Sequence, residues 1–200
     1  MCNLYRMTAT VDEMRRIFGP FAGDKNNLPS FDEIYPGFRA PVLRRDGNGG
    51  LALEMMKWGF PGPASAGSRP VTNVRNLASP FWRSALTNPQ WRCIVPATSF
   101  CEWTAEPDSQ TKRKAKVWFS LAYPEPPLFA FAGIWRPVGK EGPFMAFLTC
   151  EANETVAAVH PKAMPVMLAP SDVGPWLDNS REDACALARP FENARMRREA

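Results

Sequence analysis

Apolar residues in this chain gather in short runs of strand length, separated by polar residues, prolines and glycines. Two early runs, 38–47 and 50–60, meet at the turn sequence Asp46–Gly50 and predict a β-hairpin. Four later runs are rich in Val, Ile, Phe and Trp, which favours a β-sheet core. These later runs span residues 92–104, 114–123, 128–137 and 143–152.

Helical patterns are short and lie around these runs. Thr10 and Glu13 stand in capping-box positions and Gly19 supplies a stop, so residues 10–19 are predicted to be a helix. Further helices are expected over 79–88 with Ser79 as the cap, over 153–160, and over a C-terminal segment of about 171–200. Loops are expected over 20–36 and 61–70, and short extended segments over 71–76 and 165–170.

The length of 200 residues suits one domain, 1–200, that can bury a sizeable core. No apolar run reaches the 18 or more residues needed to cross a bilayer. The first ten residues lack the basic and long apolar regions of a secretory signal. We therefore expect a soluble, cytoplasmic and monomeric protein with no membrane partner.

The cysteines and the histidine limit the chemistry. There are five cysteines without a CxxC pair and a single histidine, His160, so neither a disulfide framework nor a multi-histidine metal site is expected. The usual phosphate-loop, dinucleotide, serine-hydrolase and zinc-protease motifs are also absent from the sequence. We therefore expect no metal and no cofactor.

The charge pattern is only weakly informative. A net charge of +4 would favour an anionic partner, but solubility explains it equally well. The polar loop 105–114 ends in Thr-Lys-Arg-Lys, a cluster that is most often a solvated face. A direct contact with nucleic acid is the alternative for that cluster.

Cys2, directly behind the initiator methionine, is the most reactive candidate. Removal of Met1 would expose an amine and a thiol on adjacent carbons, a pair that traps aldehydes as a thiazolidine ring. The same residue could attack an amide carbonyl as an N-terminal nucleophile. An ordinary thiol on a frayed terminus is the third interpretation.

Three polar residues interrupt otherwise apolar or strand-like sequence. Glu102, between Cys101 and Trp103, is expected to lie against apolar surface, which raises a carboxyl pKa and suits it to acid-base work. His160 titrates near neutrality, and Asn73 offers a donor and an acceptor to a sugar oxygen. Each also has an ordinary interpretation, as an edge-strand carboxylate, a helix-end residue and a turn residue respectively.

Several segments in this order resemble the SOS-response-associated peptidase (SRAP) family of abasic-site-processing proteins. They are MCNLY, KWGF, TNVR, RCIVPATSFCEW, TCEAN and HPKAMPVML. The resemblance implies an α+β fold, with a curved, barrel-like, mostly antiparallel sheet and short peripheral helices. It also implies a positively charged groove for single-stranded DNA.

The resemblance assigns roles to particular residues. It implies that Cys2 links to the ring-opened aldehyde of an abasic site, that Asn73 senses the site, and that Glu102 and His160 form an acid-base pair. It further implies DNA contacts by four residues: Arg75 near the backbone, Lys162 as a phosphate cation, and Pro36 and Trp58 against unstacked bases.

The chain departs from the family pattern in places that concern DNA binding. The pattern begins Met-Cys-Gly-Arg, whereas this chain has Asn3 and Leu4, and Leu77 stands where a glutamate is expected. Lys162 replaces an arginine and the segment from His160 to Met164 is one residue longer, so the bidentate fork of arginine is missing. DNA affinity or orientation is expected to differ accordingly.

The leading hypothesis is a protein that crosslinks to abasic sites in single-stranded DNA. One alternative is a Cys2-dependent thiol peptidase or amidase, which would turn over peptides without DNA. Another is a non-catalytic single-stranded DNA-binding module, which would be indifferent to an abasic site and to Cys2→Ser.

Overall fold

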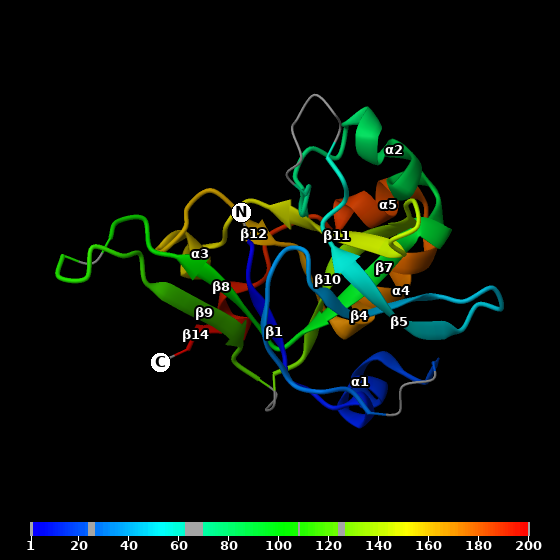
Figure 1. Cartoon of the computed structure of the whole chain (residues 1–200), viewed down its shortest axis with the longest axis horizontal. Coiled ribbons are helices and arrows are strands. Elements are labelled where there is room, and N and C mark those ends of the chain that lie inside the picture. The colour runs from blue at the N-terminus through cyan, green and yellow to red at the C-terminus, as the bar shows by residue number, and fades with distance from the viewer. Residues whose placement is uncertain (1, 24–26, 63–69, 108, 124–126, 200) are drawn as a thin grey trace.

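A ring of five paired strands forms the centre of the computed structural model, which describes all residues except 1, 24–26, 63–69, 108, 124–126 and 200 (Figure 1). The strand order is β11–β10–β7–β4–β5, and the ring closes because Phe144 and Met145 of β11 pair with Lys57 and Trp58 of β5. Closure removes the free edges of an open sheet. The strands are β4 (Arg39–Arg45), β5 (Leu51–Trp58), β7 (Arg92–Ala97), β10 (Phe129–Pro137) and β11 (Pro143–Cys150).

Four two-residue strands extend this barrel. They are β2 (Phe21–Ala22) beside β5, β6 (Asn73–Val74) and β12 (Met164–Pro165) beside β11, and β13 (Met167–Leu168) beside β10.

A second, wholly antiparallel sheet has the order β14–β9–β8–β1–β3. Only Thr98 separates β7 of the barrel from β8 of this sheet, so one strand run passes from one sheet into the other. The strands are β1 (Tyr5–Met7), β3 (Phe31–Ile34), β8 (Ser99–Trp103), β9 (Lys116–Leu121) and β14 (Met196–Arg198).

Short helices surround the two sheets. Figure 1 shows α2, α4 and α5 on one side of the barrel, α1 at one end, and α3 beside the second sheet. Most strand pairs are antiparallel, which confirms the α+β, barrel-like expectation. The helices are α1 (Val11–Phe18), α2 (Pro80–Thr87), α3 (Glu154–Ala157), α4 (Pro170–Asp178) and α5 (Arg181–Ala186), with 3-10 turns η2 (Pro89–Trp91) and η3 (Asn193–Arg195).

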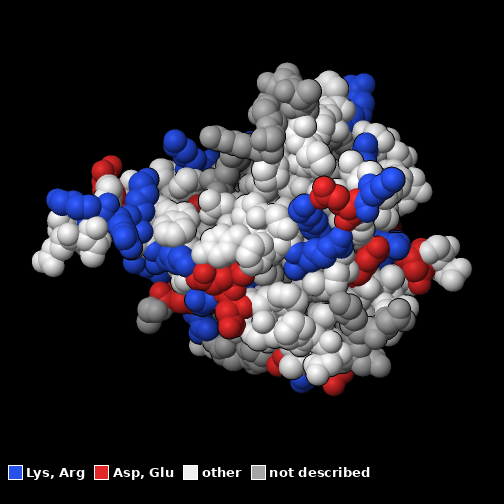
Figure 2. All heavy atoms as spheres, in the orientation of Figure 1, with Lys and Arg blue, Asp and Glu red and all other residues white. Residues whose placement is uncertain are grey.

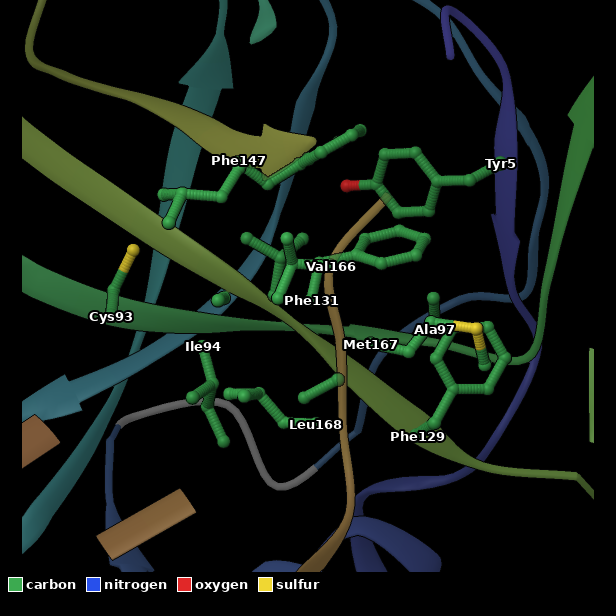
Figure 3. Close-up of a cluster of buried hydrophobic side chains, with 14 of the residues drawn as sticks. Tyr5, Cys93, Ile94, Ala97, Phe129, Phe131, Phe147, Val166, Met167 and Leu168 are labelled. Atoms are coloured by element: carbon green, nitrogen blue, oxygen red, sulfur yellow. The ribbon is translucent and has the colours of Figure 1, made fainter. Parts of the chain in front are cut away.

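Aromatic side chains fill the barrel interior (Figure 3). The rings of Phe131 and Phe147 lie 4.6 Å apart between centroids, and Tyr5 meets both edge-on. Trp58 stacks on Phe147 at 5.0 Å and is fully buried. Strands β1, β5, β10 and β11 are thus joined through one cluster of rings.

The strongest local patterns are confirmed. Thr10 and Glu13 form a complete capping box on α1, and Gly19 ends it at φ +87°. The hairpin is β4 and β5, in which Asp46 accepts hydrogen bonds from the amides of Asn48 and Gly50. The polar stretch 105–114 lies between β8 and β9, as expected.

Other expectations are corrected. The stretch 20–36 contains β2 and β3, which form because strands distant in the sequence, β5 and β1, offer them partners. Ser79 makes no side-chain hydrogen bond to α2. The run 92–104 is two strands, and helix α3 is four residues long and ends at Ala157. Most of the expected loop 61–70 lies outside the described residues.

The C-terminal segment 171–200 is helical only in part. Helix α5 ends at Ala186, and Pro190, which cannot continue a helix, follows shortly after it. Residues Met196–Arg198 then form β14 at the edge of the second sheet, paired with β9. No helix among the described residues has both the length and the apolar character that a membrane crossing requires.

Candidate functional site

Cys2 lies directly before β1, and the pairing of β1 with β8 brings it beside Glu102. Its side chain is fully buried, and its Sγ donates to the carbonyl of Leu4 at 3.5 Å. Burial, and then the negative charge of Glu102, raise the pKa of the Cys2 thiol well above its ordinary value. In this state the sulfur is a protonated thiol, unlike the thiolate of cysteine peptidases.

Glu102 extends from β8 into this buried region and is 2% exposed. Burial raises the pKa of its carboxyl to about 7, because desolvation disfavours the charged form. Near neutral pH the residue is therefore present both as an acid and as a base, which is the condition that favours proton transfer in either direction.

His160 follows α3 and faces Glu102, with its Nδ1 3.9 Å from Glu102 Oε2. Burial lowers the pKa of His160, and the positive charges of Lys162 and Lys114 lower it further. At neutral pH the two groups are thus a neutral imidazole and a half-protonated carboxyl rather than a fixed ion pair. Their separation is longer than a hydrogen bond, so a proton would pass between them through a molecule bound in the site.

Asn73 reaches the same place from β6, which is held parallel to β11 with Asn73 opposite Phe147. Its Nδ2 donates to the carbonyl oxygen of Cys2 at 2.9 Å and to Thr72 Oγ1 at 2.8 Å. A side chain 71 residues farther along the chain thereby fixes the backbone of the N-terminal segment. All four predicted catalytic residues meet around Cys2.

Some buried oxygen atoms in this part of the protein lack a hydrogen-bond partner among the described residues. They are Oδ1 of Asn73, Oε1 of Glu102 and Oγ1 of Thr149, two residues beyond Phe147 on β11. Buried polar groups in native proteins are nearly always paired, so orphaned ones call for an explanation. A bound polar molecule would supply the missing partners.

The four predicted DNA contacts differ in their surroundings. Arg75 is exposed, and its Nη1 donates to the carbonyl of Cys150 at the end of β11. Lys162 is exposed close enough to His160 to affect its pKa, and Pro36 is half-buried. Trp58 is fully buried, with its Nε1 bonded to the carbonyl of Thr72, so its ring offers no exposed face to a DNA base in this structure.

Phe38, which no sequence pattern singled out, is 55% exposed and lies two residues after Pro36. Its ring lies edge-on to Tyr35 with centroids 6.0 Å apart. An exposed ring beside Pro36 offers the flat apolar surface that Trp58 does not. The signal in the sequence was the segment Tyr-Pro-Gly-Phe, in which two aromatic residues flank a turn.

The departures at positions 3 and 4 have structural consequences. Leu4 is fully buried, whereas Asn3 is exposed and its Oδ1 accepts from Trp103 Nε1 at 3.2 Å. Figure 2 shows Lys and Arg side chains in several groups on the viewed face, most densely toward the end formed by the loop between β8 and β9. The cationic surface is therefore built from other positions than residue 4.

Comparisons with known proteins show the family of the chain. The family model described as SOS response associated peptidase (SRAP) matches residues 1–199. "Abasic site processing protein YoqW" of Bacillus subtilis (strain 168) is 25% identical over 207 residues, covering 96% of this chain and 88% of that protein. "Abasic site processing protein YobE" of the same strain is 26% identical over 195 residues, covering 92% and 84%.

Solved structures share the fold. A protein from Bacteroides thetaiotaomicron superposes with a TM-score of 0.80 at 19% identity, covering 98% of this chain and 90% of its own. A protein from Bordetella bronchiseptica gives a TM-score of 0.77 at 22% identity, covering 98% of both chains. At these identities the likeness concerns the fold alone.

Proposed function

The chain belongs to the SRAP family, whose model spans residues 1–199, and from that premise we propose that it processes abasic sites in DNA. In its finer form, the proposal is that Cys2, once Met1 is removed, forms a covalent thiazolidine with the sugar aldehyde of an abasic site in single-stranded DNA. The relatives whose printed names describe abasic site processing support the broader part.

The proposal of a covalent thiazolidine rests on one observation, the grouping of polar side chains around Cys2. Asn73 holds the Cys2 carbonyl at 2.9 Å, and the charge of Glu102 acts on the Cys2 thiol. His160 faces Glu102 at 3.9 Å. The Cys2 thiol, the Asn73 amide, the Glu102 carboxyl and the His160 imidazole thus lie in one region. Removal of Met1 would add the Cys2 amine to them, which completes the amine and thiol pair that traps an aldehyde.

The chemistry balances without an oxidant or a cofactor. The free amine of Cys2 adds to the C1′ aldehyde carbon, and loss of one water gives an imine. The Cys2 sulfur then adds to the same carbon, and the thiol proton moves to the imine nitrogen. One C–N and one C–S bond form, one water is released, and Cys2 stays attached to C1′ of the sugar through a five-membered thiazolidine ring.

Proton transfer is assigned to the Glu102 and His160 pair. With a pKa of about 7, Glu102 can donate a proton to the sugar ring oxygen during ring opening and later accept one from the amine. The neutral His160 can receive or relay that proton. The unpaired Oδ1 of Asn73 can accept a hydrogen bond from a sugar hydroxyl, which orients the sugar.

The single-stranded preference has a physical basis. A single strand presents its abasic site without the unstacking and unpairing cost of extruding a nucleotide from a duplex. Arg75 and Lys162 are exposed cations near the site, and Phe38 supplies an aromatic face for a flanking base. Cations and stacking rings are the usual elements of sequence-independent single-strand binding.

The test is incubation with a single-stranded oligonucleotide that contains one abasic site, followed by denaturing electrophoresis and intact-mass measurement. Wild-type protein without Met1 should give a stable adduct whose mass is one water below the sum of the reactants. Cys2→Ser keeps the amine but forms only a labile imine, so its stable adduct should be lost. Protein with demonstrated Met1 loss that gives no adduct refutes the finer proposal.

The two alternative functions, a thiol peptidase or amidase and a non-catalytic DNA-binding module, predict different results with the same proteins. Cys2-dependent peptide turnover without DNA would indicate a thiol peptidase or amidase. Binding that is equal for intact and abasic strands, and equal for Cys2→Ser, would indicate a non-catalytic binding module.

A further inference from the structure

The loop between β8 and β9 forms an arm that stands away from the body of the protein (Figure 1). We define the arm as residues 104–115, which the structure describes apart from 108. Its root is fixed, because the amide of Thr104 donates to the Ala115 carbonyl at 3.1 Å and the amide of Ala115 donates to Thr104 Oγ1 at 3.0 Å. The projection is therefore anchored firmly to the second sheet.

Three successive cations, Lys112, Arg113 and Lys114, occupy the return limb of the arm and are exposed. Among the described residues, none of the three forms an ion pair. Two nearby cations behave differently, since Lys116 pairs with Glu33, and Arg6 pairs with Glu199 at 3.1 Å. Figure 2 shows the resulting concentration of basic side chains at this end of the molecule.

The arm is continuous with the candidate site. It begins two residues after Glu102, and Trp103, which lies between Glu102 and the arm, is half-buried with its Nε1 bonded to Asn3. The positive charge of Lys114 also contributes to the lowered pKa of His160, after burial. The positive charge of Lys114, at the end of the arm, therefore reaches the acid-base pair.

We propose that the arm binds the single-stranded DNA flanking an abasic site on one side, with Lys112, Arg113 and Lys114 neutralising its phosphates. This inference rests on the proposed function and extends the DNA contacts beyond Arg75 and Lys162.

Two physical arguments favour DNA as the occupant. Three like charges in succession repel one another in the free protein, and a row of phosphates relieves that repulsion while releasing condensed counterions. Trp103 at the root of the arm and the three cations on its return limb supply the two elements of single-strand binding grooves, an aromatic ring and positive charge. The position beside Glu102 places any strand held there in line with the site.

The first test is the salt dependence of equilibrium binding to undamaged single-stranded DNA. The triple variant Lys112→Gln, Arg113→Gln, Lys114→Gln should lower the slope of log K against log salt by about 2, since each phosphate contact on a single strand contributes about 0.7. The matched control Arg16→Gln, Arg189→Gln, Arg198→Gln removes the same charge from exposed positions on other elements. Equal slopes for the two variants would overturn the proposal.

The second test asks whether the arm binds DNA on only one side of the abasic site. Abasic oligonucleotides are extended only on the 5′ side or only on the 3′ side of the lesion, and adduct formation is followed at sub-saturating DNA. The arm variant should lose adduct on one of the two substrates, whereas an equal loss on both would contradict the inference. Absence of any adduct with wild-type protein would instead refute the proposed function. The salt dependence measured with undamaged DNA would still show whether the arm binds single-stranded DNA.

Discussion

Glu102 links the chemistry of the site to the stability of the fold. Its pKa is about 7 in the folded protein and about 4.3 when unfolded. Between these values the folded state binds more protons than the unfolded state, so the free energy of unfolding falls as the pH rises. The carboxyl is thus expected to cost about 3 kcal/mol of stability above pH 7 relative to pH 4.

Glu102→Gln separates these two effects. The neutral amide carries no buried charge, so we expect the variant to be more stable than wild type at about pH 8 and to lose this advantage near pH 4, by the pKa argument above. Because an amide transfers no proton, adduct formation should slow on the order of 100- to 10,000-fold. Denaturant melts at both pH values and adduct rates under saturating DNA are the measurements. An equal stability difference at both pH values would contradict this account of the carboxyl.

The candidate site residues could be singled out in the sequence because their chemistry is visible locally. Cys2 is recognised from its position, and Glu102 and His160 from polar side chains within apolar surroundings. The burial of Trp58 and the exposure of Phe38 could not be predicted in this way, because exposure is a tertiary property. Closure of β5 on β11 buries Trp58, whereas Phe38 precedes β4 and remains outside.

At the scale of elements, Gly59 controls the strand that carries Asn73. It has φ +108°, and a Cβ at this position would lie 2.8 Å from Pro70 Cβ and 3.1 Å from Thr72 Cγ2. Thr72 in turn accepts a hydrogen bond from Asn73 Nδ2. The absence of a side chain at Gly59 therefore lets the segment before β6 pack close against the end of β5.

Gly59→Ala should displace this segment and weaken the hold of Asn73 on Cys2. We expect a loss of stability of about 1–3 kcal/mol from backbone strain and the clash, together with slower adduct formation. Gly19→Ala is the control, because Gly19 also has a positive φ, +87°, but nothing lies within 4 Å of its added Cβ. If both variants form adduct at the wild-type rate, Gly59 does not position Asn73.

An element could be predicted when the residues that stabilise it lie within the element itself. Helix α1 and the β4–β5 hairpin carry their own caps and turn residues, Thr10, Glu13 and Asp46–Gly50. Strands β2, β3 and β14 have two to four residues each and exist because distant strands offer them partners. A pattern within a few residues does not contain that information.

Arg92 joins the barrel to the helices on its outer side. It is fully buried on β7, and its guanidinium donates to the carbonyls of Trp176 at 2.7 Å and Asn179 at 2.6 Å, at the end of α4. Trp176 Nε1 returns a bond to the Cys93 carbonyl at 2.7 Å. Burial lowers the pKa of Arg92, although a guanidinium remains charged, and its bonds to the carbonyls at the C-terminal end of α4 compensate its desolvation.

Arg92→Met keeps much of the volume but leaves those carbonyls without a donor. We expect the whole molecule to lose about 2–4 kcal/mol of stability, because buried acceptors lose charge-assisted bonds. The Arg92→Met variant, where it is folded, should nevertheless form the adduct at the wild-type rate, because Arg92 lies outside the candidate site. Thermal unfolding and adduct assays below the melting range measure the two quantities. A slowed reaction in fully folded variant would show that the barrel–helix junction reaches the site.

Closure of the barrel also has a consequence for the order in which the protein becomes reactive. Residues 57–58 pair with 144–145, and the site joins residue 2 to residue 160. A chain emerging from the ribosome carries Cys2 from the start, yet it lacks β11 and His160 until most of translation is complete. The proposed aldehyde-trapping site is thus assembled late, so incomplete chains have Cys2 without the residues that surround it in the folded protein.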